Sequence, residues 1–117
     1  MTNVSLRLLV LKTDRVAVLC NFYGALGVKF KKEQHGNGPV HYSAQLDHGI
    51  LEVYPLSDGE RTDSTLRLGF SLADPDSCAS DVQSHGGKLI RAGRETRWGY
   101  LAIVSDPDGR IIELYRS

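Results

Sequence analysis

The sequence predicts an α+β protein of two βαβββ modules, whose strands form a curved mixed β-sheet around an open cup with the helices on its outer face. An internal repeat is the first reason for this prediction. Four features recur in the same order: Leu6-Arg7-Leu8, Asp14, Gly27 and Glu52 reappear as Leu66-Arg67-Leu68, Asp74, Gly87 and Glu113. The spacing is 60 residues for the first three pairs and 61 for the last. Matches at nearly one spacing indicate two copies of one supersecondary unit.

The order of elements within each copy is the second reason. Runs of strand length lie at 5–11, 28–34, 40–46 and 49–56, and again at 65–72, 88–92, 100–105 and 110–115. Asp14 and Asp74 stand where helix N-caps are expected, and Pro75 follows at the favoured first helical position. Gly27 and Gly86-Gly87 are typical of helix ends. Each copy therefore reads as a strand, a helix and three further strands.

The polar stretch at 57–63 has no apolar period and reads as a linker. We expect a single domain over residues 1–117, with module one at about 4–56 and module two at about 64–117.

Composition narrows the class of partner. The chain has 14 basic and 14 acidic residues, so no net field attracts nucleic acid or an anionic membrane. No apolar run approaches the ~20 residues that span a bilayer, and residues 1–11 do not resemble a signal peptide. The two cysteines, Cys20 and Cys78, read as free thiols in helices. We expect a cytoplasmic protein that recognises its partners through local sites.

Two strand-like runs carry a glutamate at their centre, Ile-Leu-Glu-Val-Tyr around Glu52 and Ile-Ile-Glu-Leu-Tyr around Glu113. Side chains alternate between the faces of a strand, so the wholly apolar face should pack on the helices and the glutamates should line the cup. A carboxylate among apolar neighbours needs a cation or hydrogen bonds. Arg7 and Arg67 in the first strands are candidate partners, which predicts two arginine–glutamate pairs.

Two motifs resemble the vicinal oxygen chelate superfamily, which comprises the glyoxalase, bleomycin resistance and extradiol dioxygenase proteins. Asn-Phe-Tyr-Gly-Ala-Leu-Gly at 21–27 is similar to the family's first-helix signature. Trp98-Gly99, followed by Asp-Pro-Asp-Gly-Arg-Ile-Ile-Glu-Leu at 106–114, resembles its C-terminal signature. The resemblance implies the tandem βαβββ fold over essentially the whole chain, and it implies a homodimer, which single-domain members generally form.

The resemblance also implies where a metal would bind. Members that bind a divalent ion take ligands from the first and last strands of each module. Glu52 and Glu113 match the last-strand positions. The first-strand positions fall on Arg7 and Arg67, or on Leu8 if the spacing from Phe22-Tyr23 is used, and none of these is a ligand. We therefore expect ion pairs and no cofactor. The alternative is a divalent metal (Zn, Ni, Mn or Fe) on the two glutamates, with His41 as a further ligand.

Other residues are candidates for the walls of the cup. Arg91, Arg94, Arg97 and Trp98 can receive an anion and stack an aromatic ring, although a solvated charged edge strand explains the arginines equally well. The loop 35–42 can cap a ligand or serve as a plain hairpin connection. The expected pocket residues are Arg7, Arg67, His41, Tyr54, Trp98 and Tyr115.

The main functional expectation is a bleomycin resistance-like protein that binds a small organic molecule in the cup without the usual metal. The alternative is a metal-dependent lyase, isomerase or dioxygenase, with Glu52 and Glu113 as metal ligands or general bases. A non-catalytic regulatory module is a third possibility. The sequence leaves open whether the chain is an enzyme.

Overall fold

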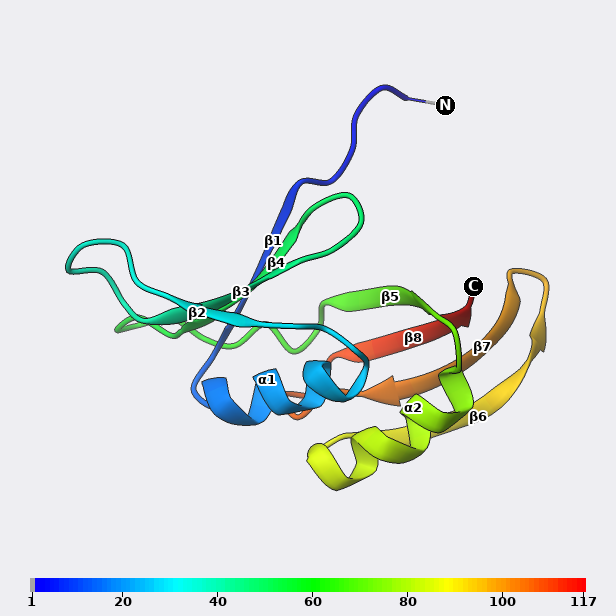
Figure 1. Cartoon of the computed structure of the whole chain (residues 1–117). Coiled ribbons are helices and arrows are strands. Elements are labelled where there is room, and N and C mark those ends of the chain that lie inside the picture. The colour runs from blue at the N-terminus through cyan, green and yellow to red at the C-terminus, as the bar shows by residue number, and fades with distance from the viewer. Residues whose placement is uncertain (1) are drawn as a thin grey trace.

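The computed structural model describes residues 2–117 and contains two four-stranded sheets of identical topology (Figure 1). The strands of the first sheet are β1 (Leu8–Thr13), β2 (Lys31–Glu33), β3 (His41–Gln45) and β4 (Ile50–Pro55), in the order β1-β4-β3-β2. Those of the second are β5 (Arg67–Leu72), β6 (Lys88–Thr96), β7 (Gly99–Ser105) and β8 (Ile111–Arg116), in the order β5-β8-β7-β6. In each sheet the first strand pairs in parallel with the last, and the other pairs are antiparallel. The predicted α+β tandem βαβββ fold is confirmed, with a separately hydrogen-bonded sheet for each module.

The helices α1 (Val16–Ala25) and α2 (Pro75–Asp81) lie on the same side of the two sheets, and the short 3-10 helix η1 (Val82–His85) continues α2 (Figure 1). Asp74 caps α2 as predicted, because its carboxylate accepts a hydrogen bond from the Ser77 amide at 3.1 Å. The matching prediction for Asp14 is wrong. β1 runs on to Thr13, so α1 begins one residue later, with Arg15 as its N-cap residue.

The apolar faces of both sheets pack against the helices, as the alternation predicts. Leu51 and Val53 of β4 and Ile112 and Leu114 of β8 are buried, together with Leu19, Phe22 and Tyr23 of α1. A single helix therefore contributes to the core beneath both modules. The approach is close at Gly87, where an added Cβ would lie 2.6 Å from the Phe22 ring.

A buried polar cluster joins the two modules at the turn that follows β7. The Tyr23 hydroxyl donates to Asp106 at 2.7 Å, and Arg110 donates to the same carboxylate oxygen at 3.0 Å. A second nitrogen of Arg110 reaches the Lys12 carbonyl oxygen at 3.1 Å. The Asp106 carboxylate also accepts from the Arg110 backbone amide at 3.0 Å, which closes the turn. The C-terminal signature thus holds the modules together, a role that the sequence did not reveal.

Cys20 and Cys78 are both free and partly buried, as predicted. Burial raises the pKa of the Cys20 thiol to about 11, which keeps it protonated. Among residues 2–117, no helix has the length and apolar character needed to cross a membrane.

Candidate functional site

The register of the first and last strands corrects the predicted position of one arginine. Glu52 pairs with Val10 on β1, and Glu113 pairs with Gly69 on β5. Two residues before these partners lie Leu8 and Arg67, so Leu8 is the structural counterpart of Arg67.

Arg7 precedes β1, and alternation places it on the opposite face from Glu52. Its side chain is exposed, and within residues 2–117 no salt bridge joins it to Glu52. The predicted Arg7–Glu52 pair is therefore wrong. The sequence match of Leu6-Arg7-Leu8 with Leu66-Arg67-Leu68 is offset by one residue from the structural match.

The predicted pair in module two is present. Arg67 donates to one oxygen of Glu113, and the Tyr115 hydroxyl donates to the other. The hydrogen bond from Tyr115 and the pairing with Arg67 together hold the pKa of Glu113 below its ordinary value. The same hydrogen bond raises the pKa of Tyr115. Gly69 leaves room for the Tyr115 ring, because a Cβ there would lie 3.3 Å from it. Glu113 is thus held as an anion with both oxygens engaged.

A hollow of about 340 Å³ opens beside this pair on the sheet of module two. Its floor is Leu101 and Ile103 of β7, and Trp98 lies in the turn between β6 and β7. The Trp98 indole is 70% exposed and lies 5.1 Å from the Arg97 guanidinium, within the range of a cation–π contact. The remaining lining residues are Arg67, Arg91, Arg94, Glu95, Thr96 and Glu113. The hollow has the size of a small-ligand site.

An irregularity in β6 directs two arginines toward the hollow. Arg91 pairs with Ile103 and Arg94 with Leu101, so both lie on the face of the floor residues. In a regular strand, two residues that are three positions apart point to opposite faces. Arg91 and Arg94 point to the same face because the pairing register shifts between them. Gly93 lies in this segment, where an added Cβ would meet Asp76 and the Tyr100 hydroxyl.

His41 occupies the corresponding region of module one. Its ring is completely buried and is stacked on Tyr54, with centroids 4.1 Å apart and planes 8° from parallel. The imidazole Nε2 lies 3.4 Å from Glu33 and 3.9 Å from Glu52. Partial burial and the carboxylates of Glu52 and Glu33 raise the pKa of the Tyr54 hydroxyl. Glu33 was not among the predicted residues.

The first-strand residues that face Glu52 and Glu113 are not suited to bind a divalent metal. Leu8 and Val10 face Glu52 from β1, and Arg67 and Gly69 face Glu113 from β5. Aliphatic side chains, glycine and a guanidinium offer no lone pair to an ion. The Glu113 oxygens are also already occupied by hydrogen-bond donors. These residues therefore do not fit the metal that the resemblance implies at this position.

A second, larger cavity of about 780 Å³ lies between the modules. Its lining comes from the start of β1 and the residues before it, from the β3–β4 turn and the start of β4, and from β5, and it includes the apolar Leu6, Leu8, Ile50, Leu68 and Phe70. The sequence did not predict this cavity. Its signal is the pair Leu6 and Leu8, two large apolar side chains that are exposed and so indicate a surface that another chain or molecule covers.

Three predicted site residues thus lie together in module two: Arg67, Glu113 and Tyr115. His41, Tyr54 and Glu52 lie together in module one. Trp98 lies at the hollow of module two, and Arg7 lines the cavity between the modules.

Comparison with known proteins agrees with this architecture. The sequence profile of the Glyoxalase/Bleomycin resistance protein/Dioxygenase superfamily matches residues 6–114. Among curated proteins, no sequence matches this chain. Similar solved structures include a glyoxalase-related enzyme from Fulvimarina pelagi, with 18% identity over 97% of this chain and 88% of that one, at a TM-score of 0.74. TnmS3, an antibiotic binding protein from Streptomyces sp. CB03234, has 21% identity over 99% and 98% of the two chains, at a TM-score of 0.72.

Two βαβββ modules, each with a glutamate at the centre of its last strand, have the architecture of the glyoxalase fold. The chain belongs to the Glyoxalase/Bleomycin resistance protein/Dioxygenase superfamily.

Proposed function

We propose that this protein binds a small organic anion with an aromatic or flat apolar portion in the hollow of module two. The observation that carries the proposal is the set of arginines around an exposed indole. Arg91, Arg94 and Arg97 line the hollow, and among residues 2–117 none of the three forms a salt bridge. Arginine presents a planar fork that matches carboxylate and phosphate groups. The anion would bind these guanidinium groups while its ring packs on Trp98.

The state of Glu113 favours binding over catalysis. A general base works best when its pKa lies near the working pH. The pKa of Glu113 is instead lowered, and both oxygens accept hydrogen bonds. We propose that Glu113 positions Arg67 at the edge of the hollow and that the protein needs no metal there. TnmS3, which shares the fold, is an antibiotic binding protein, and this similarity agrees with a binding role.

The single tryptophan makes the proposal measurable, because intrinsic indole fluorescence reports on this hollow alone. A panel of aromatic carboxylic acids and their neutral amides would be titrated into the protein. We expect saturable changes in Trp98 emission with the acids and weak or no changes with the amides. Equal responses to both members of each pair would contradict the proposal.

We also propose that the protein is a homodimer that covers the apolar cavity between the modules. Leu6 and Leu8 line that cavity and are exposed by 72% and 51%, and the nearby Val4 is exposed by 84%. An exposed apolar strand edge of this kind is typically covered by a partner. Sedimentation equilibrium of the wild type and of Leu6→Glu tests this idea. A monomeric wild type would rule it out, and a dimer weakened by Leu6→Glu is expected.

A further inference from the structure

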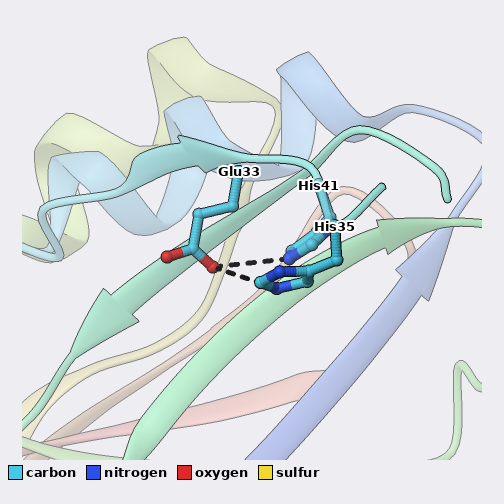
Figure 2. A group of neighbouring side chains, drawn as sticks. All are labelled: Glu33, His35 and His41. Carbon is cyan, nitrogen blue, oxygen red and sulfur yellow. Dashed lines mark ion pairs between the residues drawn. The ribbon is translucent and has the colours of Figure 1, made fainter. Parts of the chain in front are cut away.

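The hairpin formed by β2 and β3 brings together three side chains that could hold a metal ion. We propose that Glu33, His35 and His41 bind a divalent transition metal such as zinc. Figure 2 shows the three side chains converging, with the Glu33 carboxylate facing both imidazole rings. One ligand atom from each residue lies within 4.8 Å of the other two. The three ligands come from β2, from the turn after it and from β3, whereas the resemblance implies ligands on the first and last strands of each module. His41, named above as a possible further ligand, is the one residue common to both sets.

The protonation state of His41 leaves a lone pair aimed at the site. Its Nδ1 lies 3.1 Å from the Pro39 carbonyl oxygen. A carbonyl oxygen only accepts, so Nδ1 carries the proton in this contact. In the neutral ring Nε2 is then an unprotonated nitrogen. A metal-bound histidine typically has this arrangement, with its other nitrogen donating to a carbonyl or carboxylate.

The Nε2 atom of His41 is also buried without a hydrogen-bond partner. The residue is 0% exposed, and Nε2 makes no hydrogen bond within residues 2–117. A buried polar atom in this state is costly and calls for a ligand. Glu33 lies 3.4 Å away, but the geometry is not that of a hydrogen bond. Two ligands of a tetrahedral zinc, each about 2.0 to 2.2 Å from the ion, lie about 3.4 Å apart. The spacing therefore suits two ligands of one ion.

The backbone holds the three residues in place. Glu33 and His41 are direct cross-strand partners in the antiparallel β2–β3 pair. The connecting turn is closed by a hydrogen bond from the Gly38 amide to the His35 carbonyl at 2.9 Å, and Gly36 adopts a φ of 59° that suits glycine. This turn brings His35 Nε2 to 3.9 Å from the Glu33 carboxylate. The stacking on Tyr54 fixes the plane of the His41 ring.

The charges around His41 also favour a cation. Glu33 and Glu52 both face its Nε2, at 3.4 and 3.9 Å. Within residues 2–117, the salt-bridge partners of these two carboxylates are histidines alone, without lysine or arginine. No lysine or arginine in the described part of the chain therefore compensates these two carboxylates. A divalent ion supplies the compensating positive charge, and the Glu52 carboxylate, 3.9 Å from His41 Nε2, adds negative charge beside the three ligands.

The donor set identifies the class of metal. Two imidazoles and a carboxylate suit zinc, nickel or copper and are less suited to magnesium or calcium, which prefer oxygen ligands. Three protein ligands leave a position for water or a ligand oxygen. The His35 side chain is 75% exposed, so the ion can enter from solvent.

The test uses untagged full-length protein that has been treated with chelator and then freed of it. Isothermal titration with ZnCl₂, and visible spectra with CoCl₂, would be recorded for the wild type and for His41→Gln, Glu33→Gln and His35→Gln. We expect one equivalent of zinc in the wild type and d–d absorption bands with cobalt. Loss of a residue that only supports a metal ligand typically weakens metal binding by roughly 10- to 100-fold. Each ligand variant should weaken zinc binding by at least this factor.

Matched controls separate this site from other histidines and from the hollow. His48 and His85 are exposed and lie outside the cluster, so His48→Gln and His85→Gln should bind zinc as the wild type does. Trp98→Ala should also leave zinc binding unchanged, which keeps this test independent of the proposed function. Circular dichroism and thermal melting would establish that each variant folds. Absence of stoichiometric binding in the wild type, or unchanged binding in both folded Glu33→Gln and His35→Gln, would overturn the proposal.

Discussion

The Tyr23 hydroxyl in α1 donates a 2.7 Å hydrogen bond to the Asp106 carboxylate, 83 residues away in the other module. The contact is buried, and Arg110 pairs with the same carboxylate. Burial and the Asp106 charge raise the pKa of the Tyr23 hydroxyl, so it stays protonated and remains a donor. Both family signatures in the sequence therefore meet at one point, where they join the modules.

Removing this hydroxyl should destabilise the protein. Tyr23→Phe leaves a buried carboxylate with one donor fewer, and a hydrogen bond to a charged group contributes about 1.5 to 3 kcal/mol. Urea unfolding would measure the loss. Tyr42→Phe is the matched control, because the Tyr42 hydroxyl makes no hydrogen bond within residues 2–117. Equal stability of the two variants would show that the Tyr23–Asp106 contact contributes nothing.

Removing the cation should cost more. Arg110→Met leaves the buried Asp106 without its charged partner, and breaking a buried pair in this way costs about 3 to 5 kcal/mol. Arg116→Met is a suitable control, since its pair with Glu95 is exposed. A loss below about 1 kcal/mol for Arg110→Met, as expected for a surface pair, would contradict a structural role for this cluster.

The stability contributed by Glu113 should depend on pH. Its pKa is lower in the folded protein than in the unfolded chain, so the contribution is fully present above the unfolded pKa of about 4.3 and is lost as the pH falls through the folded pKa. Because Arg67 is largely exposed, we expect Glu113→Gln to cost only about 1 kcal/mol at pH 7. Denaturant unfolding from pH 7 downward should show the difference from wild type shrinking in acid. A difference that grows on acidification would have the wrong sign.

Two glycines offer a matched test of the packing between α1 and module two. Gly87→Ala would place a Cβ 2.6 Å from the buried Phe22 ring, and overpacking of this kind costs about 1 to 3 kcal/mol. Gly24→Ala adds a methyl group in α1 with no atom within 4 Å, so it should stabilise the helix by about 0.5 to 1 kcal/mol. Thermal unfolding would show opposite shifts. If both variants raised the melting temperature, the packing of the Phe22 ring against Gly87 would be looser than the structure shows.

The fold could be predicted because its signals are local and repeated. The alternation around Glu52 and Glu113 correctly identified the buried faces of β4 and β8. Strand register was harder, since the Leu-Arg-Leu match aligned Arg7 with Arg67, whereas the β1–β4 pairing places Leu8 there. One residue of slip moves a side chain to the other face of a sheet, and only the pairing itself settles it.

The site was only partly predictable for a similar reason. Arg91 and Arg94 point the same way because the register of β6 shifts between them, and a regular strand pattern would separate them. Glu33 faces His41 because the turn after β2 sets the register of the hairpin. Neither the register shift in β6 nor the register of the hairpin can be read from the alternation of apolar and polar residues. His41 was therefore predicted without Glu33, its nearest carboxylate.

The most direct test of the proposed binding function is the affinity of an aromatic carboxylate for the wild type, Arg94→Gln and Arg61→Gln, read from Trp98 emission. Arg94 lines the hollow, whereas Arg61 is exposed in the linker, so the two variants remove the same charge from different places. We expect Arg94→Gln to weaken binding by about tenfold, or about 1.4 kcal/mol, and Arg61→Gln to leave it unchanged. Equal affinities for all three proteins would contradict an anion site in the hollow of module two.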